Sequence, residues 1–562
     1  MRSHLSDSSA FICVHPRFLI LCLALLCGSC QRDIGRGGTG ELVVARPVLR
    51  EVEAIEPAQF ATSQPATAPS TRPSTRPGTT QPAAEVPLSI FDARQLALRN
   101  NLDLRVELYN PSIFREGINQ EEARFESLFT TTIDYGKTDS PSANSVSQQL
   151  EGNKSESFGI TPGLRVPLRT GGAINLQLPI DRFKSDSGSA LLNPAYTSDA
   201  AITLTQPLLR GGGVDVNAQG IRVAFYAYQQ AQARTKLSVI AVLTDVDRVY
   251  WRLYAVREAL RVRVAEYDLA TAQLDRARRL VKHQVAAEVE ILRAQSGVAD
   301  RVEQIIIAEN LVRDRQRELK RILNAPGLDM QSPARIEIAT DPRPIYYVVE
   351  PDLLISRAMT GRMELLDLEL QLARDTSDIR VARNAMLPLV SLAYTYNVNG
   401  LGGSLDDSFS MLGDSDFADH RAGLAVEVPI GNQGARSQLR QRMLSRLQTL
   451  ASVEQRELLI RQEVLNAIDQ LEANWQRILA ARQRVIAEAR VLDVEIRQFE
   501  QGLRTSTEVL EAQTRLANAK LSEISAVSDY QIAQVDIAFA TGTVLGASRV
   551  LWEPAQVGTA RP

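Results

Sequence analysis

Apolar and polar residues alternate along six short stretches of this 562-residue chain. A side-chain period of two predicts β-strands, each with one apolar and one polar face. The faces predicted to be apolar carry Phe129, Thr131, Ile133 and Tyr135; Phe158, Ile160, Leu164 and Val166; Ile174, Leu176, Leu178 and Ile180; Ala200, Ile202 and Leu204; Val390, Leu392, Tyr394 and Tyr396; and Ala422, Leu424, Val426 and Val428. The interleaved positions include Thr161, Arg165, Asn175, Gln177, Thr203, Thr205, Asn397 and Glu427. Such strands suit a membrane barrel with lipid on one face and a water-filled lumen on the other.

The connections between these strands predict their direction across a membrane. Long polar loops rich in Ser, Asp and Asn are expected at residues 137–156, 182–198 and 399–419. Residues 169–172, which include two glycines, are expected to form a tight turn. Outer-membrane barrels place short turns in the periplasm and long loops outside. Because proline interrupts strand pairing, the inward strands should end within residues 166–168, 206–208 and 428–430.

We therefore expect six strands from each chain. Six strands cannot close around a wide passage, so an oligomer is required. The alternative is that the hairpin of residues 157–182 lies off the wall, either over the pore mouth or packed at the barrel base.

Two very long amphipathic helices follow the two groups of strands. From Val214 to about Lys282 there is no proline, and Gly220 is the only glycine. The second helix carries a heptad seam of apolar residues at Val464, Ile468, Leu471, Trp475, Ile478 and Val485. At 1.5 Å per residue each helix is roughly 100 Å long, and its many Arg, Glu and Gln residues indicate an aqueous compartment.

The chain is internally duplicated. Residues 290–295 (EILRAQ) and 508–513 (EVLEAQ) nearly repeat each other, and Trp251 and Trp475 lie at similar places in the two long helices. Each half predicts strands, a long helix, a tight turn and a returning helix, which is the plan of a duct. We expect a first repeat at 88–325, an equatorial connector at 326–348, a second repeat at 349–546 and a C-terminal tail at 547–562.

The N-terminal segment predicts export and a lipid anchor. An apolar run from Phe18 to Leu26 is too short to span a bilayer and indicates a signal peptide over residues 1–29. The small residues before Cys30 resemble a bacterial lipobox, which would make Cys30 a lipidated first residue, and Gln31 then favours the outer membrane. Simple signal cleavage is the alternative. Residues 30–87, rich in Pro, Thr and Ser, are expected to form a disordered tether.

Charge and composition exclude several other functions. The 63 basic and 66 acidic residues provide no field that would attract nucleic acid. All four cysteines lie at or before Cys30, and beyond them only His283 and His420 could supply imidazole, so no metal site, cofactor or catalytic residue is predicted. The glycine runs at 211–213 and 400–403 lack the Lys and Ser/Thr of a phosphate loop. We expect a protein that is not an enzyme.

Three segments resemble the TolC-type outer-membrane efflux duct family, in its lipoprotein branch. They are the opening helix LSIFDA with NNLDL (88–104), the strand-to-helix segment LTQPLLRGG (204–212) and the tip GLRTSTEVL (502–510). The resemblance runs from about residue 88 to 546. It implies a mainly α-helical homotrimer in which an outer-membrane β-barrel continues into a long periplasmic α-helical coiled-coil barrel. Members of that family usually supply four strands each, which the hairpin of residues 157–182 exceeds.

The helix turns are the candidate functional sites. Thr505 and Glu508 have the spacing of a capping box, and Gly502 can take the positive φ that ends a helix. In the resembling family this tip contacts a periplasmic adaptor, so the resemblance assigns adaptor binding to Gly502, Leu503, Arg504 and Thr505. A simple well-capped turn is the alternative. The first tip, residues 282–288, lacks the glycine and the Ser/Thr cap. We therefore expect this tip to be a looser partner than the second tip.

Charged residues near both tips are gate candidates. In an oligomer each is repeated around the axis and could form a ring that selects ions or holds the duct closed, although charges on a helix are commonly only a solvated face. The candidates are Glu288, Glu290, Arg293, Glu508 and Glu511.

These expectations combine into a passive exit duct in the outer membrane. It would serve a tripartite efflux or type I secretion system, with a periplasmic adaptor, an inner-membrane pump and outer-membrane lipid as partners. A structural coiled-coil lipoprotein that spans the periplasm is the alternative from another class.

Overall fold

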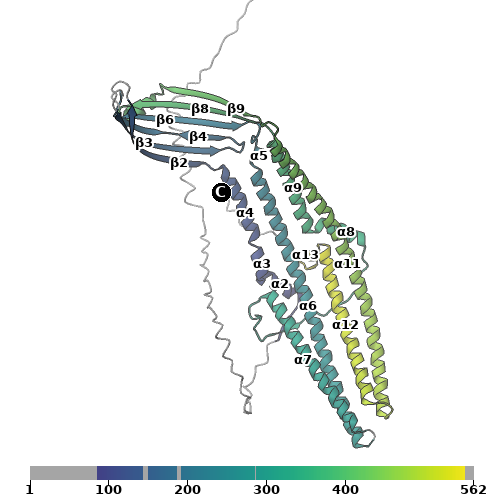
Figure 1. The fold of residues 1–562 in the computed structure, drawn as a ribbon. Helices are drawn as coiled ribbons and strands as arrows, with labels where there is room; N and C mark the ends of the chain where they lie inside the picture. Colours follow the sequence, from purple (N-terminus) through teal and green to yellow (C-terminus); the bar gives the residue numbers. More distant parts are fainter. Residues whose placement is uncertain (1–84, 144–149, 187–190, 285–286, 551–562) are drawn as a thin grey trace, which may run out of the picture.

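The structure is an elongated molecule with a β-sheet at one end and helical hairpins at the other (Figure 1). It is a computed structural model that describes residues 85–143, 150–186, 191–284 and 287–550. The predicted signal peptide, Cys30 and residues 30–84 of the predicted tether lie outside the described residues. Residues 85–87 were expected to end the disordered tether, but they belong to a strand, which pairs in parallel with residues 335–337. No helix within the described ranges has both the length and the apolar character to cross a membrane.

The first repeat contains a group of short helices, six strands and a long hairpin. Its elements are β1 (Glu85–Leu88), α2 (Ile90–Asn100), α3 (Leu102–Glu107), α4 (Asn110–Glu122), η2 (Ala123–Phe125), β2 (Leu128–Ala143), β3 (Leu150–Pro167), β4 (Ala173–Gln177), β5 (Ile180–Ser185), β6 (Ala195–Pro207), α5 (Val214–Asn217), α6 (Gln219–Lys282) and α7 (Val289–Leu323). The predicted first long helix is therefore interrupted at Ala218, which separates α5 from α6.

The second repeat follows the same order with fewer strands. After β7 (Arg335–Ile338) come α8 (Pro351–Gly361), α9 (Met363–Asn384), β8 (Leu389–Gly402), α10 (Leu405–Asp414), β9 (Ala418–Glu427), α11 (Gln433–Glu500), α12 (Ser506–Ala540) and α13 (Val544–Ala547). Both halves thus pass from short helices to strands and then to a long hairpin. The proposed domain boundaries remain a prediction.

All strands except β1 and β7 form one antiparallel sheet. Its order is β2-β3-β4-β6-β8-β9, and β5 pairs with β3 and β6 as β4 does. β4 and β5 share one register and occupy a single position, interrupted at Leu178 and Pro179. Pro179 lies opposite the region of Pro162, and neither proline has an N–H for the ladder. The prediction of six strand positions, with the 157–182 hairpin inside the sheet, is confirmed.

The register places the predicted apolar residues on one face across the whole sheet. One row runs through the paired residues Phe129, Leu164, Leu176, Ile202, Tyr396 and His420. The neighbouring row on the opposite face runs through Leu128, Arg165, Asn175, Thr203, Thr395 and Arg421. A one-residue slip in any pair would exchange the two faces, so this continuity means that all five pairings satisfy the same pattern.

The three polar loops are shorter than the sequence predicts. β2 and β3 stay paired as far as Ala143 and Leu150, β5 continues to Ser185, and α10 occupies the middle of the 399–419 segment. These strand ends are polar on both faces, so the period-two pattern of apolar residues does not predict them. The tight turn is confirmed, with Gly171 at a φ of 92°. β9 ends at Glu427, ahead of its proline segment.

The helices form a layer four helices wide. Near the sheet the order across the layer is α4, α6, α9 and α11, and toward the tips it is α7, α6, α12 and α11. The seam residues Val464, Leu471 and Ile478 are buried, as their heptad spacing predicts. A core around Tyr250, Leu253, Leu319 and Ile336 ties α2, α6, α7 and β7 together midway along the layer.

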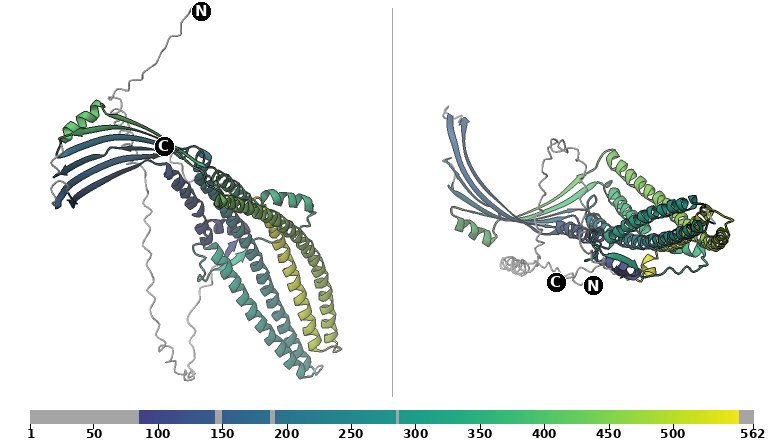
Figure 2. Two further views of the ribbon diagram at one scale, coloured as in Figure 1. Left: turned by 45° about the horizontal axis from the view of Figure 1, so that its top comes forward. Right: turned by 90° about the horizontal axis from the view of Figure 1, so that it is seen from below.

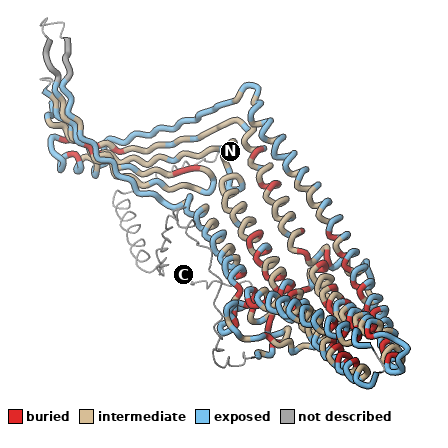
Figure 3. Tube along the Cα trace, turned by 60° about the horizontal axis from the view of Figure 1, so that its bottom comes forward, coloured by how far each residue is buried: buried red, intermediate tan, exposed pale blue. Residues whose placement is uncertain are grey.

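The two flanks of the molecule expose strand edges and apolar residues. Figure 3 shows buried residues gathered within the helical layer and exposed residues along its outer helices and strands. Every residue of β9 is exposed, and α11 beside it presents Leu444, Leu458, Leu465, Leu479 and Ile486 at multiples of seven residues. The opposite flank presents a second apolar row on α7 at Leu292, Val302, Ile306, Ile307 and Leu311. Apolar rows of this kind on both flanks are typical of helices that pack against further helices.

Candidate functional site

The turn between α11 and α12 is a rigid, fully bonded loop. Gly502 has a φ of 73°, and its N–H donates to the Phe499 carbonyl at 3.0 Å. The N–H of Leu503 donates to the Gln498 carbonyl at 3.0 Å. These two bonds and the left-handed glycine make a Schellman motif, which satisfies the last carbonyls of α11. The predicted role of Gly502 in ending this helix is confirmed.

A capping box begins the returning helix. The backbone N–H of Thr505 donates to Glu508 Oε2 at 2.7 Å, and both halves of the box are present. Arg504 donates to Glu508 Oε1 at 2.6 Å and to Gln498 Oε1 at 2.9 Å. The Thr505 N–H, followed by the Arg504 guanidinium, holds the pKa of the Glu508 carboxyl below its usual value. This tip therefore keeps Glu508 charged.

Leu503 is the apolar point of that tip. Its side chain is 71% exposed, whereas Arg504 beside it is held by carboxylates on both helices, Glu508 and Glu495. An exposed leucine on a turn whose backbone is fixed on both sides can be buried by a partner with little loss of conformational entropy. The structure thus presents the four predicted tip residues together, on one short loop.

The first tip is built differently. Gln284, which is not a glycine, takes a φ of 58°, and Glu288 caps α7 without a side-chain hydrogen bond. Residues 285 and 286 lie outside the described residues. The N-cap of α7 is thus not Ser or Thr, as the sequence predicts. That this tip is a looser partner than the second tip remains a prediction.

A buried carboxylate joins the two tips. Glu290 Oε2 accepts a hydrogen bond from the backbone N–H of Ser506 at 2.9 Å, and its Oε1 accepts from Arg293 at 2.7 Å. Glu290 is 8% exposed and Ser506 is fully buried. Ser506 is the first residue of α12, so a carboxylate from one hairpin meets the positive end of a helix in the other.

The five gate candidates therefore fall into separate groups. Glu290 and Arg293 pair with each other on α7, Glu508 belongs to the capping box, and Glu511 lies 3.9 Å from Arg515 on α12. Glu288 is exposed at the start of α7. Only Glu290 among them links the two hairpins directly. None of these placements tests a ring around an oligomer axis, which remains a prediction.

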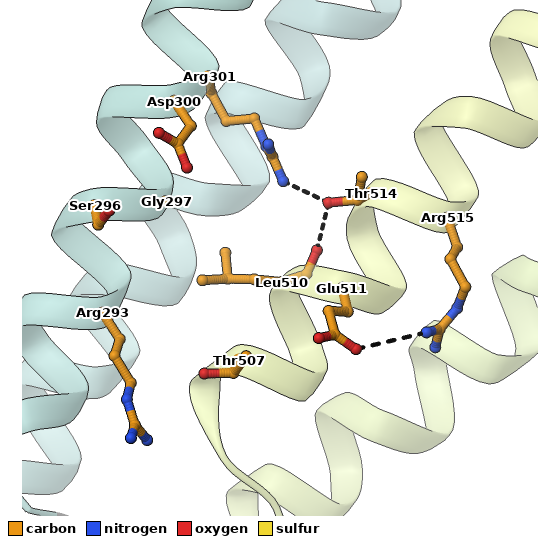
Figure 4. A pocket seen from close by; sticks show the side chains of 10 residues that line it. All are labelled: Arg293, Ser296, Gly297, Asp300, Arg301, Thr507, Leu510, Glu511, Thr514 and Arg515. Atoms are coloured by element: carbon orange, nitrogen blue, oxygen red, sulfur yellow. Dashed lines mark hydrogen bonds and ion pairs between the residues drawn. The ribbon is translucent and has the colours of Figure 1, made fainter.

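An open groove separates α7 from α12 just beyond the tips (Figure 4). We name it the tip groove; its volume is about 590 Å³. Its lining consists of Arg293, Ser296, Gly297, Asp300 and Arg301 from α7 and Thr507, Leu510, Glu511, Thr514 and Arg515 from α12. Leu510 reaches toward Gly297, where an added Cβ would lie 2.9 Å from its Cδ1. Glycine at 297 thus allows the two hairpins to approach at the floor of the groove.

A buried ionic cluster adjoins the tip groove through Arg301, which lines the groove. Glu266 is 2% exposed and faces Arg263 and Arg301, whose nitrogens lie 2.9 and 2.8 Å from its oxygens. Arg301 also donates to Thr514 of α12 at 2.6 Å. The cluster joins α6, α7 and α12. No sequence pattern predicts this cluster, because its members lie far apart along the chain and resemble ordinary charges on exposed helices.

The described residues hold no group of three or more His, Cys, Asp or Glu side chains that could bind a metal ion. His283 lies at the first tip, at the end of α6, and His420 lies in β9 in the sheet, at opposite ends of the molecule.

Known proteins share this organisation. Residues 354–543 match the Outer membrane efflux protein family. The chain is 26% identical to the Outer membrane protein TolC of Escherichia coli over 196 residues, which is 34% of this chain and 40% of that protein. It is 24% identical to the Pyoverdine export outer membrane protein OpmQ of Pseudomonas aeruginosa over 412 residues, covering 69% of this chain and 79% of OpmQ.

Solved channels share the fold at lower identity. The Campylobacter jejuni CmeC outer membrane channel superposes with a TM-score of 0.57 and 14% identity, over 85% of this chain and 94% of CmeC. The sheet continued by two long hairpins therefore has a direct counterpart among outer membrane channels. The second repeat of the chain thus matches the Outer membrane efflux protein family, and the chain is similar to TolC-type proteins in sequence and to outer membrane channels in fold.

Proposed function

We propose that the chain is the outer-membrane exit duct of a tripartite efflux or type I secretion system, through which substrates pass passively from a periplasmic pump to the exterior. The observation that carries this function is the continuous two-faced sheet. Its apolar face suits lipid and its polar face suits a water-filled lumen. The helical layer extends from one end of that sheet, so the same passage continues into the periplasm.

Three copies would close the duct. β2 and β9, the two edges of the sheet, run antiparallel, so β9 of one copy can pair with β2 of the next. The apolar rows on α11 and α7 lie on the same two flanks and would meet in the same ring. Three times six strand positions give a wall of eighteen. Ring closure also covers the exposed strand edges, which otherwise promote aggregation.

The second tip is the proposed adaptor site. Leu503 with its fixed neighbours Gly502, Arg504 and Thr505 would be buried by a periplasmic adaptor, which connects the duct to an inner-membrane pump. Leu503→Asp should abolish export without disturbing the oligomer, because it places an unpaired charge in the contact. Leu503→Met is the matched control and should export normally. Normal export by a correctly assembled Leu503→Asp protein would refute the assignment.

A lipid on Cys30 is proposed as an additional anchor. Its removal in Cys30→Ser should leave the oligomer in the membrane, because the sheet offers a broad apolar face to lipid. Metabolic labelling with palmitate should be lost in this variant, and persistent labelling would exclude Cys30 as the modified residue.

Ion conductance separates a duct from a solid scaffold. The purified oligomer in a planar bilayer should produce discrete conductance steps if the polar face lines a lumen. A periplasm-spanning scaffold of the same helices would insert without conducting, and that outcome would reject the duct.

A further inference from the structure

The short helix α10 lies against the sheet at the end far from the hairpins, where Figure 2 shows it in green. It leaves the end of β8 and returns into β9. The register of β8 with β6 runs without interruption to Gly402, so Val398, Gly400 and Gly402 share a face with Tyr394 and Tyr396. That face is the apolar one.

The contacts of α10 place it on this apolar face. A Cβ added at Gly400 would lie 2.3 Å from the Ser408 carbonyl oxygen, and one added at Gly402 would lie 2.6 Å from the Ser408 nitrogen. Ser408 and Ser198 are both fully buried and share a hydrogen bond between their hydroxyls. Small residues on β6 and β8 therefore replace large aliphatic ones where the helix covers the wall.

The uncovered part of α10 is amphipathic. Leu405, Phe409 and Leu412 follow spacings of four and three, which align them on one side next to the sheet-facing residues. Leu405 is 44% and Phe409 is 37% exposed. The other side carries the polar residues Asp406, Ser410 and Asp414. Leu191 and Leu192 add further exposed apolar surface, and Leu192 lies near Gly403.

The height of α10 on the wall matches a membrane boundary. Gly400 is ten residues along β8 from Val390, which corresponds to about 33 Å of strand at 3.3 Å per residue. A strand tilted by about 40° then rises about 25 Å, the usual height of the apolar band of such barrels. The helix thus lies where hydrocarbon gives way to headgroups, if the opposite end of the strand marks the inner boundary.

We propose that α10 is an external interfacial helix that inserts Leu405, Phe409 and Leu412 into the outer leaflet of the membrane. This inference rests on the proposed function, because it requires the apolar face of the sheet to contact lipid. A helix with one apolar and one polar side binds a bilayer surface in this orientation. Here the sheet fixes the helix at one depth, so α10 also sets the height of the barrel in the membrane.

Spin labels on single cysteines test the location. All native cysteines lie at or before Cys30, so replacing those four with serine leaves a full-length background for Phe409→Cys, Ser410→Cys and Leu424→Cys. Each carries a nitroxide in the assembled protein in lipid vesicles, and its collisions with apolar oxygen and with a water-soluble nickel chelate are measured. Phe409→Cys should favour oxygen over nickel as strongly as the wall position Leu424→Cys does. Ser410→Cys, one residue away on the polar side, should favour nickel.

The outcomes distinguish this inference from the function on which it rests. Nickel preference at Phe409→Cys together with oxygen preference at Leu424→Cys would place α10 in water and overturn the inference alone. Shielding of Phe409→Cys from both reagents would mean that a second copy of the chain covers it, which also overturns the inference. Nickel preference at Leu424→Cys would remove the sheet from lipid and reject the proposed duct as well.

Discussion

The carboxylate of Glu290 accepts a hydrogen bond from the backbone N–H of Ser506, 216 residues later, and so joins the tips of the two helical hairpins. The bond is buried, and the same carboxylate is paired with Arg293. Its acceptor charge meets the first free N–H groups of α12, where a helix attracts anions. Any movement that separates α7 from α12 at the tips must break this contact.

Removing that acceptor should loosen the tips. In Glu290→Ala the buried Ser506 N–H loses its partner, which typically costs about 1–3 kcal/mol. Hydrogen exchange at the start of α12 should accelerate, and channel conductance in planar bilayers should rise if the contact contributes to closure. Glu303→Ala is the control, since Glu303 is exposed on α7 away from the tips and its loss should leave both measurements unchanged. Unaltered exchange in Glu290→Ala would show that the contact does not hold the tips.

The left-handed turn at Gly502 predicts a separate effect. Gly502→Ala keeps the side chain small but places a Cβ at a φ of 73°, a conformation that costs L-residues about 1–2 kcal/mol. Local protection of residues 499–505 from exchange should fall while the rest of α11 and α12 is unaffected. Gly434→Ala, near the helix start and with no atom within 4 Å of an added Cβ, is the control. Equal protection in both variants would contradict the strain argument.

The pair formed by Arg94 and Asp247 predicts a stability change that depends on pH. Arg94 donates to both Asp247 oxygens at 2.7 Å, across the contact between α2 and α6. Burial raises the pKa of Asp247 above its ordinary value, and the Arg94 guanidinium opposes that rise. Arg94→Leu leaves the carboxylate buried without its partner, which should cost about 3 kcal/mol at pH 7.

The sign of the pH effect follows from proton binding. In Arg94→Leu the folded protein holds the Asp247 proton more tightly than the unfolded chain does. Stability should therefore fall as pH rises from the ordinary carboxyl pKa through the raised folded pKa. Thermal unfolding followed by circular dichroism should show a larger loss at pH 7 than at pH 5. The double variant Arg94→Leu with Asp247→Leu should recover much of the loss, and a double variant as unstable as the single one would contradict this account.

The sheet was largely predictable because a membrane wall imposes a strict period of two. Once one face must be apolar, residues such as Leu164, Leu176 and Ile202 can pair in only one register. Beyond the apolar band both faces are polar, so the outer parts of β2 and β3 carry no such signal and their sequence predicts loop. The interruption at Pro179 was readable from the sequence, since proline cannot donate to the ladder.

The helix α10 and the tip contacts differ in what a sequence could reveal. Ser404 and Asp407 form an N-cap pattern ahead of apolar positions at Leu405 and Phe409, so a helix inside the predicted loop could have been found. The bond between Glu290 and Ser506 has no local signal, because it depends on how two hairpins pack. The same holds for Glu266 and Arg301.

The last prediction concerns the hairpin of residues 157–182, which occupies two neighbouring positions in the sheet. Leu164 pairs with Leu176 on the apolar face, and Arg165 pairs with Asn175 on the polar face. If this hairpin crosses the membrane within the wall, cysteines at Leu164 and Leu176 should resist a water-soluble thiol reagent because lipid shields them. Cysteines at Arg165 and Asn175 should react through the lumen. Leu164 and Arg165 are neighbours in sequence, as are Asn175 and Leu176. The two members of each neighbouring set should differ in reactivity, so each is the control for the other.

Blocking the passage with a polymer completes that test. Reaction at Arg165→Cys and Asn175→Cys should be slowed by a bulky polymer added to the passage, whereas labelling at the open ends of the duct should not change. Equal labelling of all four positions would place the hairpin in water and leave four strand positions in the wall. Protection of all four would mean that a second copy or another segment covers the polar face, which would contradict a lumen at that height.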